Sequence, residues 1–530
     1  MRGKVHIIVV VVLLYGAVFA QTAQVGTIEG IVVDSVTNSP IIGVVVRTAN
    51  PGLPDSTATT NREGRFVLAG VSPGEHRIVA TKPGFLNDSS ANVRVVLDTG
   101  QQIQSVVYRM TPAGVITGRV VDDEGRPMRG AQVQALAFGY REGKRQLVPQ
   151  GTAATNDRGE FRVFWLDPGA YHVVVNPSGW YIPTNTDSRF IMTYYPGTSD
   201  FQKSEIVRIA SGEHDVRAIQ MASTPTRNIR GRIVGAIPER PDIPQTYNFA
   251  ITLQSLAEVP YASSAEFPIM VDRTTQQFEL KAGVEPGPYR AIARYRTPFA
   301  TFVGSTKINI DRDDLEDVQI PIQKNLSVQG QVKFEGTQST GTRDTPLSVT
   351  YVPDQLSADL TATASVRDDG RFALESVFPN RYSVHLKGLP DDAYLAGVSV
   401  QSRDAEPDSI QFPSGVANVN LTLTVKHDGG KVSGIVTNAE GQPQTGATIV
   451  FFPEAAFRSR LDLYKNAESN NKGAFLIRGL APGNYTVLAF RHLESGAFQS
   501  SSFLQDFEDQ GVRLAVISGG DSQLSLTSIP

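Results

Sequence analysis

Cysteine is absent from all 530 residues of the chain. The chain therefore has no disulfide, no thiolate nucleophile, no cysteine-bound zinc and no cysteine for lipid attachment. An excess of positive charge is also missing, because 49 Lys and Arg are set against 53 Asp and Glu, for a net charge of −4. Since binding of nucleic acid needs a basic face, this balance argues against a nucleic-acid partner.

Long apolar runs are rare, and the one that stands out is at the N-terminus. Arg2 and Lys4 precede a run from Val5 to Ala20 that is short for a membrane span and ends in small residues suited to cleavage after Ala20. We therefore expect residues 1–20 to be a signal peptide, with a retained N-terminal anchor as the alternative. After cleavage the chain would be secreted, periplasmic or at the surface of a bacterial cell, without a membrane-spanning segment.

Metal-ligand patterns are also missing. The seven histidines are scattered, and no H-E-x-x-H string occurs. The acidic run from Asp311 to Asp317 lacks the central glycine and bidentate glutamate of an EF-hand loop, so a solvated turn is favoured over a loose calcium site. We predict no metal and no cofactor.

Two strings match catalytic motifs but lack what the chemistry needs. Gly70-Val71-Ser72-Pro73-Gly74 fits G-x-S-x-G, yet the residue after Ser72 is a proline, which has no N–H for an oxyanion hole. Asp98-Thr99-Gly100 has no second copy to provide the paired carboxylates of an aspartic protease. We predict that the chain has no catalytic residues and is not an enzyme.

What the sequence does contain is a repeat, seen most clearly from Asn470 to Phe490. A polar turn ending in Gly473 leads to Phe475, and Pro482-Gly483 then precedes Tyr485 on the next short strand. The turn proline recurs at positions 73, 168, 286, 379 and 482, and in the third copy Gln276 replaces the turn glycine. A spacing near 100 residues is typical of one domain per repeat.

Each repeat opens with a strand that carries a glycine at the same place, namely Gly30, Gly118, Gly231, Gly330 and Gly434. Short alternating strands without helical periodicity predict an all-β chain, a tandem array of about five immunoglobulin-like, seven-stranded β-sandwiches. Short linkers predict a rod of these domains. The expected boundaries are 21–111, 112–223, 224–323, 324–428 and 429–530.

The combination of a G-x-V first strand, an [ND]-x-x-G-x-F turn and P-G-x-Y resembles the carboxypeptidase regulatory-like domain. That family is similar to transthyretin and to the carbohydrate-binding-like fold. The resemblance covers nearly all of the mature chain, most clearly in the first, second and fifth repeats. It implies a β-sandwich with an accessory, non-catalytic role on exported bacterial proteins, and no fixed ligand. A self-formed isopeptide cross-link is disfavoured, because lysine occurs near the first strands only at Lys333 and Lys431.

One region of the second repeat is rich in aromatic residues. Trp180, Tyr181, Tyr194 and Tyr195 lie there among polar residues, and flat aromatic faces beside polar groups suit sugar rings or protein contacts. We therefore predict these four as ligand-binding residues, with packing between the second and third domains as the alternative.

The expected function is binding or spacing at the bacterial cell envelope, with a carbohydrate or an envelope protein as partner. The alternative is an accessory portion of an outer-membrane receptor or exported peptidase system whose active domain lies on another chain.

Overall fold

The computed structural model describes residues 25–49, 55–87, 93–177, 188–210, 212–216, 218–235, 248–257, 261, 264–272, 274–296, 301–336, 346–353, 361–378, 380–412 and 418–530. Strands and short turns make up almost all of them, which confirms the predicted all-β class. The predicted signal peptide lies outside the described residues. Within the described ranges, no helix is both long and apolar enough to cross a membrane.

The strands fall into five successive groups, units 1 to 5, which we propose as the five predicted domains. Unit 1 contains β1 (Gly26–Asp34), β2 (Val45–Ala49), β3 (Thr57–Thr59), β4 (Arg65–Val71), β5 (Gly74–Thr81), β6 (Phe85–Asn87), β7 (Arg94–Leu97) and β8 (Gln102–Pro112). Unit 2 contains β9 (Gly114–Val121), β10 (Gln132–Arg141), β11 (Lys144–Ala154), β12 (Glu160–Leu166), β13 (Gly169–Asn176), β14 (Ser188–Phe190), β15 (Thr193–Tyr194), η1 (Phe201–Lys203), β16 (Ile206–Ile209), β17 (Gly212–Asp215), β18 (Ile219–Gln220) and β19 (Ser223–Pro225).

Units 3 to 5 continue the series. Unit 3 contains β20 (Arg227–Val234), β21 (Asn248–Ser255), β22 (Ser264–Pro268), β23 (Gln277–Ala282), β24 (Gly287–Arg296), β25 (Thr301–Ile310), β26 (Leu315–Pro321) and β27 (Gln323–Lys324). Unit 4 contains β28 (Leu326–Glu335), β29 (Ser348–Pro353), β30 (Ala362–Ser365), β31 (Arg371–Val377), β32 (Arg381–Lys387), β33 (Tyr394–Val400), β34 (Arg403–Ala405), β35 (Ile410–Gln411) and β36 (Asn418–Lys426). Unit 5 contains β37 (Gly430–Thr437), β38 (Thr448–Pro453), η3 (Ala455–Phe457), η4 (Leu461–Leu463), β39 (Lys465–Glu468), β40 (Ala474–Leu480), β41 (Gly483–Phe490), η5 (Ala497–Gln499), α1 (Ser501–Gln505), η6 (Glu508–Gln510), β42 (Val512–Val516) and β43 (Asp521–Thr527).

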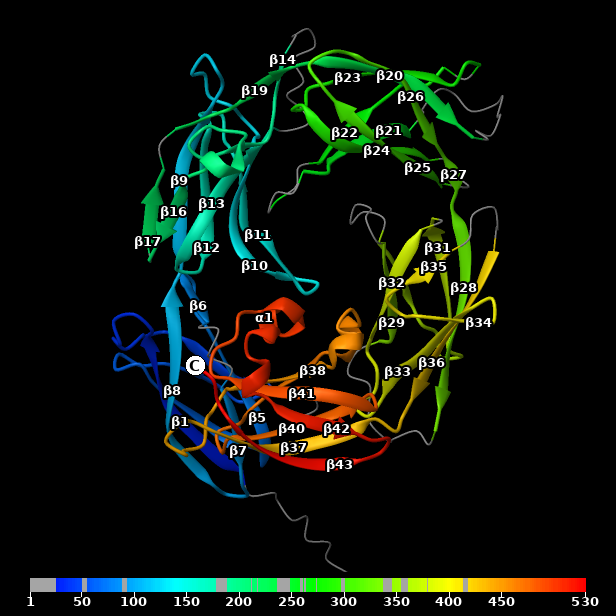
Figure 1. Cartoon of the computed structure of the whole chain (residues 1–530). Helices are drawn as coiled ribbons and strands as arrows, with labels where there is room; N and C mark the ends of the chain where they lie inside the picture. Colours follow the sequence, from blue (N-terminus) through cyan, green and yellow to red (C-terminus); the bar gives the residue numbers. More distant parts are fainter. Residues whose placement is uncertain are drawn as a thin grey trace, which may run out of the picture.

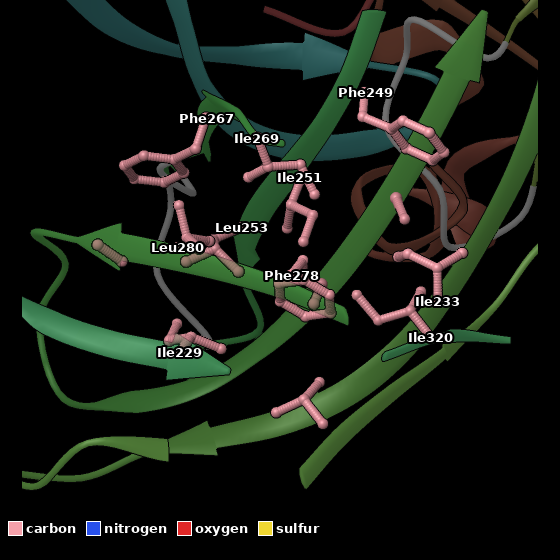
Figure 2. Packing of buried hydrophobic residues seen from close by; sticks show 14 of the residues in the cluster. Ile229, Ile233, Phe249, Ile251, Leu253, Phe267, Ile269, Phe278, Leu280 and Ile320 are labelled. Atoms are coloured by element: carbon pink, nitrogen blue, oxygen red, sulfur yellow. The ribbon is translucent and has the colours of Figure 1, made fainter. Parts of the chain in front are cut away.

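All five units share one sheet topology. The first strand lies between the strand that follows the polar turn, to which it is antiparallel, and the closing strand, to which it is parallel, as in the order β40-β37-β43. A second sheet, β39-β38-β41-β42 in unit 5, covers the other side of the core. Each pair of sheets encloses its own cluster of buried hydrophobic residues. In unit 3, Phe278 lies in the middle of this cluster with Ile251 and Ile233 nearby (Figure 2).

The repeated first-strand glycine faces the repeated phenylalanine across the sheet. The pairs are Gly30 with Phe66, Gly118 with Phe161, Gly231 with Phe278, Gly330 with Phe372 and Gly434 with Phe475. A Cβ on Gly434 would lie 2.1 Å from the carbonyl oxygen of Leu524 and 2.7 Å from the Phe475 ring. The glycine thus makes room for the aromatic ring and for the closing strand, which explains why the two residues recur together.

In all five units the residue two positions before the repeated phenylalanine is left-handed, with φ of +68° at Gly64, +73° at Gly159, +57° at Gln276, +79° at Gly370 and +72° at Gly473. In unit 5 the side-chain oxygen of Asn470 accepts hydrogen bonds from the N–H groups of Lys472 and Ala474, at 2.9 and 3.0 Å. Gln276 therefore occupies the glycine position, as predicted, and takes the strained conformation without a glycine's freedom.

We expect Gln276→Gly to stabilise unit 3 by about 0.5–1 kcal/mol. A left-handed side-chain residue costs about 1–2 kcal/mol, and the extra entropy that glycine loses on folding offsets part of the gain. Urea unfolding should show a raised midpoint for the transition of unit 3. Gln277→Gly, one residue along at an exposed strand position, is the control and should be destabilising. A lowered midpoint for Gln276→Gly would contradict the assignment of this turn.

The five units do not form the predicted rod. The chain instead curves around a ring, and unit 5 (orange to red) comes back beside unit 1 (blue), as Figure 1 shows. Two ion pairs join these units, Arg94 to Glu468 and Lys472 to Asp98, each at 3.8 Å. Short linkers hold successive units close together but do not fix the angle between them, so the sequence did not reveal the curvature.

An insertion in unit 5 completes the ring. Residues 491–511, between β41 and β42, contain η5, α1 and η6 and cover the outer face of the β38–β41 sheet with a second small core. On its other side the insertion contacts the β10–β11 hairpin of unit 2. The Phe503 and Tyr140 rings lie 5.7 Å apart, centroid to centroid.

Two glycines allow this contact to be close. A Cβ on Gly143, at the hairpin tip, would lie 2.6 Å from the carbonyl oxygen of Gln499, and one on Gly496 would lie 2.7 Å from that of Tyr140. Both glycines are also left-handed, with φ of +72° and +81°. The hairpin and the insertion thus approach each other backbone to backbone, which leaves no space for side chains at these two positions.

Candidate binding site

The predicted aromatic region is only partly described. Trp180 and Tyr181 lie outside the described residues. Tyr195 is half-buried against the unit 2 core, and Tyr194 is 1% exposed. Tyr194 therefore has no ring face available to a ligand, which corrects the prediction for this residue.

Tyr194 instead packs between units 2 and 3. Its hydroxyl donates to the carbonyl oxygen of Tyr261 at 3.4 Å, and its ring meets Phe201 at 5.6 Å. The Tyr261 hydroxyl in turn donates to the side-chain oxygen of Gln134 at 2.9 Å. Burial raises the pKa of Tyr194 well above its ordinary value. The contact of Tyr194 with Tyr261 is thus packing between units 2 and 3.

The strings that resemble catalytic motifs have structural partners. The His76 ring nitrogen Nε2 bonds to the backbone oxygen of Ser72 at 2.7 Å, which matches the bond from the Tyr171 hydroxyl to the Asp167 carbonyl in unit 2. Asp98 lies in the turn that leads from β7, in one sheet of unit 1, to β8, in the other, and its carbonyl oxygen accepts from the Gln101 N–H at 3.0 Å. Both strings therefore lie in turns between strands of the sandwich, where these hydrogen bonds stabilise the turn.

The acidic residues between Asp311 and Asp317 in unit 3 also form hydrogen bonds and ion pairs within their own unit. Asp314 accepts hydrogen bonds from the backbone and side-chain nitrogens of Asn228, both at 2.8 Å, and Glu316 pairs with Arg230 at 2.6 Å. Across the part of the chain that the structure describes, no three His, Asp or Glu side chains come together in a way that would hold a metal ion.

A wide concavity lies where units 1, 2 and 5 meet. It has a volume of about 1090 Å³ and is open to solvent on one side. Unit 1 contributes the end of β1 and the end of β8, unit 2 contributes the β10–β11 hairpin and the β12–β13 turn, and unit 5 contributes the start of its insertion. We call this concavity the junction cavity. It exists only because the ring closes.

Unit 2 provides an aromatic and basic wall. The Arg145 guanidinium lies 4.6 Å from the centroid of the Phe138 ring, a cation–π contact that orients the arginine over the hairpin. Tyr140 and Tyr171 lie in the same wall. Burial raises the pKa of Tyr171 to about 12, with a further contribution from Asp167, so its hydroxyl stays protonated at physiological pH.

Unit 5 provides an acidic wall. Glu494 lies opposite the hairpin, with Oε1 3.7 Å from where a Cβ on Gly139 would be. Burial raises the pKa of Tyr140, and the charge of Glu494 adds to that rise while Arg145 opposes it. Glu468 lies deeper and pairs with Arg94. The cavity thus offers hydrogen-bond donors and acceptors of both charges beside aromatic rings.

The sequence alone did not predict the junction cavity. Arg145 and Glu494 are 349 positions apart in the chain, and nothing in either repeat marks them as neighbours. The insertion after β41, residues 491–511, was a weak signal, because unit 2 also has a long segment, residues 177–205, between β13 and β16.

A family model for the carboxypeptidase regulatory-like domain matches residues 27–107 and 115–188, in units 1 and 2. These matches fall on two of the three repeats that carry its turn motifs most clearly, the first and the second. No curated protein matches the chain.

Three solved structures are among those similar to parts of the chain. A minor pilin of Streptococcus agalactiae is 14% identical, over 41% of this chain and all of the pilin, with a TM-score of 0.21. A shaft pilin of Lactobacillus rhamnosus GG is 14% identical, over 40% of this chain and all of the pilin, with a TM-score of 0.19. The major pilin subunit of Bacillus cereus is 12% identical, over 59% of this chain and 99% of the pilin, with a TM-score of 0.15. Scores this low carry no argument about arrangement or role.

Proposed function

Since residues 27–107 and 115–188 are carboxypeptidase regulatory-like domains, we propose that the chain is an exported, non-catalytic binding protein of the bacterial cell envelope. Its ligand is a carbohydrate held in the junction cavity. The regulatory-like family and the structural turns around Ser72 and Asp98 support a role without catalysis.

The single observation that carries the proposal is the composition of the junction cavity. Sugar rings stack their C–H faces on aromatic rings, and their hydroxyl groups both donate and accept hydrogen bonds. Tyr140 and Phe138 provide ring faces, Arg145 provides donors, and Glu494 provides acceptors. A volume of about 1090 Å³ is at the large end for small-molecule sites, so a short oligosaccharide fits better than a single sugar.

The test is calorimetric titration of the chain without its signal peptide against maltoheptaose, cellohexaose and chitohexaose. For the oligosaccharide that binds, Arg145→Ala and Glu494→Gln should each weaken affinity by about tenfold, because each removes a charged hydrogen-bond partner. Arg47→Ala is the matched control. Arg47 is an exposed arginine that pairs with Asp55 in unit 1, away from the cavity, and its loss should leave affinity unchanged.

Two results would count against the proposal. One is the absence of binding to any of the three oligosaccharides or to isolated envelope polysaccharide. The other is binding that neither cavity variant weakens. If the chain instead co-purifies with an outer-membrane receptor or an exported peptidase, the accessory role would replace the carbohydrate role.

A further inference from the structure

Trp165 has an unusual backbone conformation for its residue type. It lies near the end of β12 with φ of +63°, in a bulge between Val163 and Leu166 where the pairing with β9 shifts. Left-handed φ is uncommon for any residue except glycine and is a true outlier for a bulky one. Such outliers persist where the surroundings impose them and cluster at functional sites.

Two sibling units have a glycine at this position. Counting from the repeated phenylalanine of the turn, the positions that match Trp165 are Gly70 in unit 1 and Gly479 in unit 5, whereas units 3 and 4 have Ala282 and Ser376. Both are left-handed, at +70° and +65°. A Cβ on Gly70 would meet nothing within 4 Å, so the bulge leaves space for a side chain that points outward. Unit 2 therefore places its tryptophan where the same fold is satisfied by glycine.

The tryptophan is also exposed, next to a second exposed aromatic residue. Trp165 is 44% exposed and Phe164 is 54% exposed. Burial in the unit 2 core explains neither side chain, because Val163 and Leu166 on either side supply the buried contacts. Bulges often redirect a side chain beside a binding site.

The neighbours of the pair are polar. Glu160 and Arg162 precede it on β12 and are exposed, and Arg119 lies across from Glu160 on β9. The exposed area of the two aromatic rings amounts to roughly 200 Å², given the 150–250 Å² of a whole aromatic side chain. That is well short of the roughly 800 Å² per partner of a stable protein interface. The patch has the size and surroundings of a sugar-stacking surface.

The pair also lies at the edge of the junction cavity. Asp167 and Pro168 line the cavity, and Asp167 is two residues after Trp165, so their Cα atoms are within about 7 Å. We infer that Phe164 and Trp165 form a stacking subsite for a carbohydrate chain that extends out of the junction cavity. This inference rests on the proposed function for its ligand class, but it assigns a separate surface.

The decisive variant is Trp165→Gly, which introduces the residue found at this position in units 1 and 5. Because glycine accepts the left-handed conformation, the melting temperature should stay the same or rise, so a loss of binding cannot be attributed to unfolding. Affinity for the oligosaccharide that binds the chain should fall by about tenfold, as expected when one stacking contact is removed. Phe457→Ala removes a similarly exposed aromatic residue of unit 5 and should change nothing.

Fluorescence tests the subsite independently of the cavity. The sequence has two tryptophans, so a Trp180→Phe background leaves Trp165 as the only indole. Titration with cellohexaose, maltoheptaose or chitohexaose should shift the emission of Trp165 to shorter wavelength, and the shift should persist, at higher ligand concentration, in the Arg145→Ala variant.

The outcomes separate the two proposals. Unchanged affinity in Trp165→Gly together with weakened binding in Arg145→Ala would overturn the subsite and leave the cavity standing. A shift of Trp165 emission with unaffected binding in both cavity variants would support the subsite and overturn the cavity. No emission change with any oligosaccharide, or a change only with envelope proteins, would overturn the subsite.

Discussion

Gly434→Val is expected to destabilise unit 5 while the other units keep their stability. The valine side chain would have to occupy the space of the Leu524 carbonyl and the Phe475 ring, which lie 2.1 and 2.7 Å from the position of a Cβ. Neither can move freely, because Leu524 is on the closing strand and Phe475 is buried in the core. Overpacking of this kind costs about 3 kcal/mol.

Hydrogen exchange in the intact chain measures this effect unit by unit. A loss of 3 kcal/mol should speed exchange of peptides from residues 430–527 by about 100-fold, with little change in units 2 and 3. Gly397→Val is the matched control, because Gly397 lies in a strand with ordinary φ and a Cβ there would meet nothing within 4 Å. Equal effects of the two substitutions would show that the space around Gly434 is not what the repeat requires.

The second large effect is expected from Gly496→Val, which should open the ring between units 2 and 5. The substitution forces a side chain toward the Tyr140 carbonyl and places valine at a φ of +81°. Gly143→Val disrupts the same contact from the hairpin side, because its side chain would clash with the Gln499 carbonyl oxygen. It should give the same result. Small-angle scattering should show a larger radius of gyration for both variants, and oligosaccharide affinity should fall because the cavity loses one wall.

The control for these variants is Gly125→Val. Gly125 is also left-handed, at +79°, but a Cβ there would meet nothing within 4 Å. It therefore has the backbone strain without the contact. If Gly125→Val expands the chain as much as Gly496→Val does, strain within a unit rather than the contact between units explains the expansion.

The features that the sequence predicted are those fixed within about ten residues. Asn470, Gly473 and Phe475 identify the turn because its hydrogen bonds and left-handed residue are local requirements of the backbone. Even Gln276, which lacks the glycine, was placed correctly from Phe278 beside it. Local turn chemistry and two-residue alternation were sufficient for the fold class.

The arrangement of the units and the candidate site were not predicted, because they depend on contacts between distant parts of the chain. Glu494 faces the hairpin of Arg145 only after the three linkers between units 2 and 5 have each set an angle that no local motif encodes. Tyr194 looked like a surface aromatic but is buried by Tyr261, which belongs to the next unit. Trp165 could have been noticed, since it replaces the glycine found at positions 70 and 479, but a composition scan favours dense aromatic clusters over a single exceptional position.

If the five units close into a ring, units 2 and 5 lie close together, and the distance between them tests this arrangement most directly. The chain has no cysteine, so Arg141→Cys and Gln510→Cys give two specific sites for spin labels. A closed ring predicts one narrow, short distance by pulsed electron resonance, which broadens in Gly496→Val. A rod would separate units 2 and 5 by on the order of 100 Å, about three domain diameters. A wild-type chain without any short-distance population would contradict the ring, and with it the junction cavity.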